Sequence, residues 1–355
     1  MARINFDLQN DVVNDTQRVV TSTWSNNTND LRPFPLFHTS STQADFSSAT
    51  SKGAFFIEVY NEATSSDSSA VQYAVAYGHK AGSGSLDFTN ATNALGNSPT
   101  KVIYNQYRQL VFGDENQSFS FPGDGSTSAF TPDDIYVINI NRSRYKNNLK
   151  PGTLNLTLAS ASVFLHLTDD SITSTGSAQI TNAGRQFNIV SGSSGVRLGS
   201  STIQTTDSGS FGLFYPDSGF IILNPAALDH YLSGSVHFGA LTPDTTSNNS
   251  SNNHQKLLNA IDSGSSFIVD SEETISSKYY FTRIKNNEFN FTTNPSFIDA
   301  NGNLRYSSME NNPKVFITTV GLYNDTNDLV AVAKLSKPIA KDFSKEALIR
   351  VKLDY

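Results

Sequence analysis

The fold expected for this chain is decided by the stretch from Val315 to Tyr355, which reads VFITTVGLYNDTNDLVAVAKLSKPIAKDFSKEALIRVKLDY. Two apolar runs, Val315 to Tyr323 and Leu329 to Leu335, flank the polar tetrad Asn324 to Asn327. Apolar runs separated by a short Asn- and Asp-rich segment are typical of two antiparallel strands and their turn. The stretch therefore predicts a β-hairpin.

A third run closes this stretch after Pro338, which we expect to end the hairpin pairing. The polar residues Arg350, Lys352 and Asp354 alternate with apolar ones. The apolar set consists of Ile349, Val351, Leu353 and Tyr355. Because alternation with period two is the pattern of a strand with one covered face, we expect a three-strand meander here.

The composition agrees with a mainly β chain. Only 16% of the 355 residues are charged, while Phe (24) and Tyr (14) are numerous. Mixed α/β enzymes usually carry more Ala, Leu, Glu and Lys in long periodic helices. The chain is long enough for two or three domains, each with its own core. We therefore expect a mainly β, multi-domain fold of β-sandwich or meander domains with a few short helices.

Shifts in composition and the positions of the apolar runs predict four parts. They are an extended amino-terminal arm (1–53), a β-rich domain with one packed helix (54–168), a β-rich middle domain or insertion (169–275), and a carboxyl-terminal domain that contains the meander (276–355). The boundary near Thr168 rests on the Ser-, Thr- and Gly-rich composition that follows it.

Local signals place one helix and two pairs of strands. Ser98 is a candidate N-cap with Pro99 in the first turn, and Gly113 is a candidate end. Between them an apolar stripe recurs at helical spacing: Val102, Ile103, Tyr107, Leu110 and Val111. The aromatic residues Tyr104, Tyr107 and Phe112 are better explained by core packing than by a ligand platform. The predicted strand pairs are Ala54 to Tyr60 with Ala70 to Tyr77, and the two halves of Phe211 to Leu223.

Charge and cysteine content exclude several classes of protein. The net charge is −7 and the chain has no long basic run, so the clustered cations that nucleic-acid binding needs are missing. There is no cysteine, and therefore no disulfide or thiolate metal site.

No apolar run approaches the roughly 20 residues of a membrane span, and no signal-peptide core opens the sequence. We expect a chain that is made and folded in the cytoplasm.

Three Asp-Ser-Gly triplets, at Asp207, Asp217 and Asp262, invite comparison with an aspartic-protease loop. That chemistry needs two carboxylates that share a proton on matched lobes, and the spacing of the triplets does not provide them. We interpret the triplets as turn and capping residues. We predict no catalytic residue.

The histidines also give no metal site. The six residues are His38, His79, His166, His230, His237 and His254. No pair has the four-residue helical spacing of a zinc site. We expect His166, inside an apolar run, to be a hydrogen-bonded core residue, and we predict neither a metal nor a cofactor.

The stretch Ile317 to Asn324, followed by Leu329 to Leu335, resembles a hairpin of bacteriophage tail-fibre and baseplate proteins. In those proteins a VGLY strand, a polar turn and an LxAVA strand follow one another in this order. Further stretches are similar to virion structural proteins of large contractile-tailed phages that infect marine cyanobacteria. They are Tyr73 to His79, Phe214 to Asn224, Tyr279 to Asn290 and Ala347 to Tyr355.

This resemblance implies a non-enzymatic structural subunit of a phage virion, in the tail baseplate or the fibre-attachment region. Its partners would be other virion tail and baseplate proteins and copies of itself in a symmetric assembly. It would be assembled in the host cytoplasm and carried in the virion. We hypothesise that Ile349, Val351, Leu353 and Tyr355 form the assembly interface, because a terminal edge strand can add to a partner sheet.

Two other functions stay open. A host-receptor or glycan-binding protein at the tail tip would use Tyr, Trp and Asn to stack on sugars and hydrogen-bond them. A surface-polysaccharide hydrolase would need two carboxylates that face one groove, and the spacing nominates no such pair.

Overall fold

The described residues of this computed structural model fold into two compact units, and strands dominate both. The structure describes residues 4–25, 38–44, 51–63, 65–85, 96–123, 129–160, 163–172, 178–197, 205–206, 209–230, 241–245, 253–264, 266–292 and 294–355, with the side chains of 38–44, 51–55, 205–206 and 229–230 left out. The larger unit comprises residues 19–273, and the smaller unit residues 1–18 and 274–355. The expected mainly β fold is confirmed.

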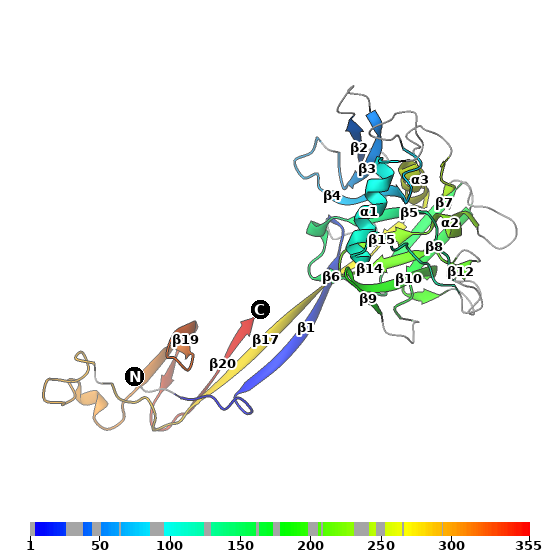
Figure 1. The fold of residues 1–355 in the computed structure, drawn as a ribbon. Coiled ribbons are helices and arrows are strands. Elements are labelled where there is room, and N and C mark those ends of the chain that lie inside the picture. The colour runs from blue at the N-terminus through cyan, green and yellow to red at the C-terminus, as the bar shows by residue number, and fades with distance from the viewer. Residues whose placement is uncertain are drawn as a thin grey trace. The chain divides into compact units, whose positions relative to one another are not determined.

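The larger unit is built on one curled sheet of 12 strands, drawn from blue to yellow in Figure 1. In sheet order its main strands are β16 (Ser266–Ile268), β7 (Asn155–Ser160), β8 (Val163–Asp169), β10 (Gly184–Ser193), β14 (Gly212–Tyr215), β15 (Phe220–Leu223), β5 (Asp134–Ile140), β4 (Val71–His79), β3 (Ser51–Tyr60) and β2 (His38–Ala44). All these neighbours pair antiparallel. The predicted pairs β3–β4 and β14–β15 are confirmed.

Short strands complete this unit. They are β9 (Gln179–Thr181) and β11 (Val196–Arg197), which pair with β10; β12 (Thr205–Thr206) and β13 (Gly209–Ser210), which pair with each other; and β6 (Asn148–Leu149), which pairs with β17. A 3-10 helix covers Arg142–Arg144. Thr168, near which the composition predicts a domain boundary, lies inside β8, and one sheet takes strands from both sides of it.

The central strands of this sheet are covered on both faces. Ile138 and Val75 belong to one buried cluster, whereas their neighbours Val137 and Ala76 belong to another. Because a strand buried on both faces needs apolar residues at every position, runs such as Phe220 to Leu223 are apolar throughout. The two cores of the unit are thus separated by the sheet itself.

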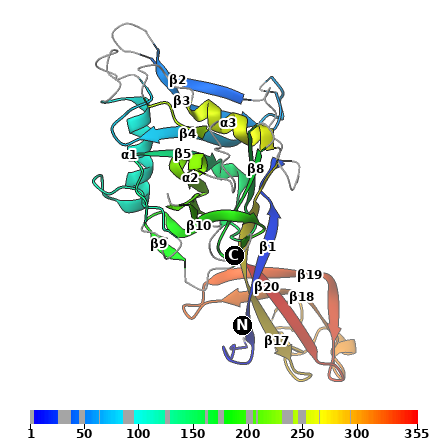
Figure 2. The same cartoon turned by 90° about the vertical axis from the view of Figure 1, so that its right-hand side faces the viewer.

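Helices cover these two faces. Helix α1 (Pro99–Phe112) packs on one face, and helix α3 (Asn253–Gly264) contributes Leu257, Leu258 and Ile261 to the cluster on the other. The short helix α2 (Pro225–His230) joins the same cluster as α3. Figure 2 shows α1 and α3 as separate ribbons beside β4. Among the helices of the described residues, none is long and apolar enough to cross a bilayer.

Helix α1 begins and ends where the sequence predicts. Gly113 follows it in the left-handed conformation (φ 67°) and donates its N–H to the Gln109 carbonyl. The Ser98 hydroxyl does not cap the helix but donates to the Gly82 carbonyl oxygen at 2.8 Å. Tyr104 and Tyr107 are buried, which confirms their role in the core.

The apolar stripe predicted for α1 is partly wrong. Val102 and Leu110 are 40% and 44% exposed, whereas Ile103 and Val111 are buried. The buried arc centres on Tyr104 and Tyr107, because these large rings fill the space above the sheet.

Trp24 anchors the segment that leads into the sheet. Its ring is 2% exposed and lies 4.9 Å from the Phe267 ring and 6.1 Å from the Tyr73 ring, centroid to centroid. Its indole Nε1 donates to the Phe267 carbonyl oxygen at 2.8 Å. One side chain therefore supplies both apolar burial and a partner for a buried backbone carbonyl.

We predict that Trp24→Phe lowers the free energy of unfolding of the larger unit by about 2–4 kcal/mol, since it removes this hydrogen bond and leaves a void. Urea unfolding followed by far-UV circular dichroism measures the change. Val102→Ala, at a 40% exposed position of α1, is the matched control and should change the midpoint little. Equal midpoints for the two variants would contradict the prediction.

The smaller unit contains a sheet and a hairpin. The sheet has β17 (Asp270–Ile284) between β1 (Val12–Ser22) and β20 (Ala347–Asp354), and the hairpin joins β18 (Val315–Tyr323) to β19 (Leu329–Lys341). A 3-10 helix covers Ser307–Met309 in the connection. The hairpin crosses β20 in Figure 2. The predicted hairpin is confirmed.

The predicted three-strand meander is wrong, because β20 pairs with β17 and not with β19. Its Ile349 and Val351 are buried in one cluster with Leu322 of the hairpin, so β20 and the hairpin meet face to face. Pro338 does not end β19 either. Cross-strand partners jump from Ile317↔Ile339 to Thr319↔Lys334, and the proline lies within this irregularity, where its missing N–H removes no regular ladder bond.

Candidate functional site

The Asp-Ser-Gly triplets occupy turn and helix-end positions where they are described. Asp217 lies in the β14–β15 turn, where Arg185 donates to its carboxylate from Nε at 3.0 Å and from its backbone N–H at 2.8 Å. Burial raises the pKa of Asp217, but the bonds from Arg185 outweigh it and leave the pKa below its usual value. Asp262 lies near the end of α3, and Asp207 falls outside the described residues. Asp217 is thus an ion-pair partner.

The described histidines do not converge on one place. His79 Nδ1 accepts bonds from the N–H groups of Ala81 and Ser83, and burial lowers its pKa. Burial also lowers the pKa of His254, to about 4. The side chains of His38 and His230 are not described, and His237 lies outside the described residues. Within the described ranges, no three His, Asp or Glu residues come close enough to hold a metal ion.

His166 differs from its predicted place. Its Nδ1 lies 3.0 Å from the Thr157 hydroxyl, which confirms the hydrogen bond, but the side chain is exposed and not in the core. The alternation within β8 explains this. Leu165 and Leu167 point into the core, so Phe164 and His166 must point outward.

The four residues predicted as an assembly interface divide into two groups. Ile349 and Val351 are only 5% and 6% exposed because they pack against the hairpin of the same chain, and Leu353 is half-buried against this cluster. Tyr355 is 64% exposed, with the Lys278 ammonium 5.6 Å from its ring centroid. Their role in assembly stays a prediction.

Large apolar side chains are exposed mainly in the smaller unit. Of twenty such described residues, thirteen lie there and seven in the larger unit, which is more than twice as long. The thirteen are Leu8, Val13, Phe289, Phe291, Tyr306, Phe316, Tyr323, Leu329, Val330, Val332, Phe343, Leu348 and Tyr355. Concentrated exposed apolar surface is a mark of interaction sites.

Three of these residues form one patch on the outer face of the hairpin. Val332 is the cross-strand partner of Gly321, and Leu329 is that of Tyr323. A Cβ built on Gly321 would lie 3.1 Å from both the Leu329 and the Tyr323 side chains, so these two lie over the glycine. We call Tyr323, Leu329 and Val332 the hairpin patch. Their exposed fractions are 40%, 52% and 52%.

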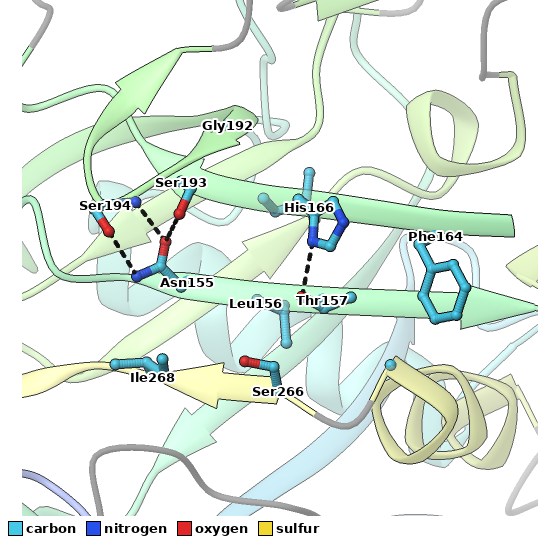
Figure 3. A pocket seen from close by; sticks show the side chains of 12 residues that line it. Asn155, Leu156, Thr157, Phe164, His166, Gly192, Ser193, Ser194, Ser266 and Ile268 are labelled. Carbon is cyan, nitrogen blue, oxygen red and sulfur yellow. Dashed lines mark hydrogen bonds between the residues drawn. The ribbon is translucent and has the colours of Figure 1, made fainter.

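A groove of about 450 Å³ lies in the larger unit on the outer face of β16, β7 and β8 (Figure 3). We call it the β8 groove. Its polar side chains are Asn155, Thr157, His166, Ser193, Ser194 and Ser266, and its apolar ones are Leu156, Phe164, Leu167 and Ile268, with Gly192 and Gly264 completing the lining. None of these twelve residues carries a carboxylate, an ammonium or a guanidinium.

The rim of the groove is held by Asn155. Its side-chain oxygen accepts bonds from the Ser193 hydroxyl at 3.1 Å and from the Ser194 backbone N–H. Sequence reasoning missed this site, although the alternation of β8 already places Phe164 and His166 on one face. Apart from Leu167 of β8, the other lining residues come from β7, β10 and the turn after it, α3 and β16, and spacing along the chain does not bring them together.

The half-buried acid Asp134 lies outside the groove. The Tyr77 hydroxyl donates to Asp134 Oδ2 at 2.9 Å. Burial raises the pKa of Asp134 to about 6, and the bond from Tyr77 offsets only part of this effect. Because the folded state binds the proton more tightly than the unfolded state, stability from this group is fully present below about pH 4 and is lost as the pH rises through about 6.

We therefore predict that Asp134→Asn becomes more stable relative to the natural chain as the pH rises from about 4 to about 7, by about 1–3 kcal/mol at the upper end. Melting temperatures measured across this range test it. Val102→Ala, at a 40% exposed position of α1, changes no titratable group and is the control, so its difference from the natural chain should not depend on pH in this way. A pH-independent difference for Asp134→Asn would contradict the assignment.

The described residues thus offer two candidate surfaces, the hairpin patch and the β8 groove, in different units. The patch can bury apolar area against another protein, and the groove can hold a small neutral ligand. Comparisons of the chain with protein-family models, with curated proteins and with solved structures find no match.

Proposed function

We propose that this chain is a structural subunit of a bacteriophage virion, a tail baseplate or fibre-attachment component that acts by assembly with other virion proteins and with copies of itself. The observation that carries the proposal is the concentration of exposed large apolar side chains in the smaller unit. Such side chains lose contact with water only when another surface covers them. The resemblance of the hairpin sequence to phage tail proteins gives the class of assembly.

Strand edges add a second means of attachment. Strands β1 and β20 are the outer strands of the sheet in the smaller unit. An outer strand presents backbone N–H and C=O groups that a partner strand can use. The edge of β20 is formed by alternating cations and apolar residues, among which Leu348 is 66% exposed.

Charge on β20 disfavours its antiparallel pairing with a copy of itself in the registers centred on Arg350, Val351 or Lys352. Arg350 and Lys352 lie on the same face of the strand, the one that also carries Leu348. In a symmetric antiparallel pairing centred on Val351, Arg350 would stand directly opposite Lys352 of the copy. Centring on either cation would place it opposite itself. Like charges directly opposite each other destabilise strand pairing.

Contacts between copies are better explained by the opposite charges of the two units. Residues 1–18 and 274–355 contain 13 Lys and Arg against 11 Asp and Glu, a net charge of +2. Residues 19–273 contain 12 against 21, a net charge of −9. Attraction between the smaller unit of one copy and the larger unit of the next would give a head-to-tail contact, which closes into a ring if the rotation allows.

We predict that Leu329→Ser combined with Val332→Ser leaves the chain folded but strongly reduces its incorporation into virions, because both side chains are 52% exposed and belong to the hairpin patch. Purified particles are assayed by mass spectrometry and imaging, and folding by circular dichroism. Val102→Ser in α1 is the control for loss of one exposed apolar side chain.

Normal incorporation of the double variant would exclude the hairpin patch, and absence of the natural chain from particles would exclude the virion role. Point substitutions are preferable to deletion of residues 347–355, because Ile349 and Val351 fill the core of the smaller unit. A deletion would unfold this unit and test stability instead of assembly.

A further inference from the structure

The lining of the β8 groove combines polar side chains with an outward-facing phenyl ring, and packing of the core does not require that ring. Phe164 is 52% exposed on the outer face of β8, next to the exposed His166, while Leu165 and Leu167 of the same strand fill the core. The outer face of an antiparallel strand usually carries polar residues. An exposed phenyl ring inside a concave, mostly polar lining is therefore a feature to be explained.

The lining restricts the kind of ligand. A charged ligand would leave water for a groove whose twelve described lining residues include no Asp, Glu, Lys or Arg, which is unfavourable. A wholly apolar ligand would cover the Ser266 hydroxyl and His166 Nε2 without giving them a hydrogen-bond partner. A ligand with both apolar C–H faces and several hydroxyl groups meets neither penalty. Neutral saccharides have this combination.

The positions of the side chains agree with this chemistry. Figure 3 shows Phe164 on β8 and Ser266 on β16, on either side of Thr157 of β7. His166 Nδ1 is engaged with Thr157, so its Nε2 is the nitrogen that can meet a ligand, as donor or acceptor according to the tautomer. The volume of about 450 Å³ falls within the range of small-ligand sites, roughly 300–1,000 Å³.

A close backbone contact and side-chain hydrogen bonds fix the shape of the groove. Gly264 ends α3 directly against β7, and a Cβ at this position would collide with the Thr157 carbonyl oxygen. Asn155 fixes the Ser193 and Ser194 rim through side-chain hydrogen bonds. A ligand would therefore meet a largely pre-formed surface, which limits the entropy lost on binding.

We propose that the β8 groove binds a neutral saccharide, with the Phe164 ring stacked on a sugar C–H face and with His166, Thr157 and Ser266 hydrogen-bonded to its hydroxyls. This site lies in the larger unit and does not depend on the assembly role of the smaller one. Binding without hydrolysis is expected, since the lining holds no pair of carboxylates.

The test is saturation-transfer NMR on the full chain with maltotriose, cellotriose and triacetylchitotriose, each at millimolar concentration, and with the charged sugar sialyllactose. We expect transfer to ring C–H protons of at least one neutral sugar. Phe164→Ala should weaken that binding about tenfold or more, and His166→Ala should weaken it less. Phe316→Ala removes an exposed ring (63%) of the smaller unit and should leave binding unchanged. Melting curves check that each variant is folded.

The proposal is overturned if no neutral sugar shows transfer, if sialyllactose binds better than the neutral sugars, or if Phe164→Ala binds as well as the natural chain. Sedimentation of the same variants gives an independent outcome. If Phe164→Ala abolishes self-association and no sugar binds, the groove is an interface between copies, which also overturns saccharide binding.

Discussion

Burial of one sheet from both sides is the constraint on which the larger unit depends. Strands β14, β15, β5 and β4 separate two apolar clusters, so most of their positions must fit into one core or the other. Helices α1 and α3 cover these faces, and each is amphipathic because only one of its sides packs against the sheet. Where this cover ends, on the outer face of β8, Phe164 and His166 are exposed and become a surface that can meet a ligand.

The smaller unit differs from the larger one in where its apolar side chains lie. Some of them form a small core, and many others are exposed to solvent. Ile284, Leu322, Ala347, Ile349 and Val351 form that core. The exposed residues around it exceed what the rest of the molecule shows. The larger unit provides a stable core and the neutral β8 groove. The smaller unit provides exposed apolar surface, which the proposed assembly role requires.

Much of the local structure could be predicted from sequence. The ends of α1 followed from Pro99 and Gly113, and the hairpins β18–β19 and β14–β15 followed from polar turns between apolar runs. The partner of β20 could not be predicted, because alternation tells which face is covered and not which strand lies alongside. The outward direction of His166, by contrast, follows from the alternation of β8, in which Leu165 and Leu167 point inward. The β8 groove was missed because its lining comes from segments far apart in sequence.

The order of strands in the smaller unit constrains how the chain acquires its structure on the ribosome. Strand β1 lies beside β17 although residues 23–269 separate the two strands along the chain, and β20 is the other neighbour of β17. The larger unit can therefore become compact before the strands that complete the sheet of the smaller unit, β17 and β20, have been synthesised. Until β20 emerges, β17 lacks one of its two neighbours, so the nascent chain exposes an unpaired strand edge until its last residues are made.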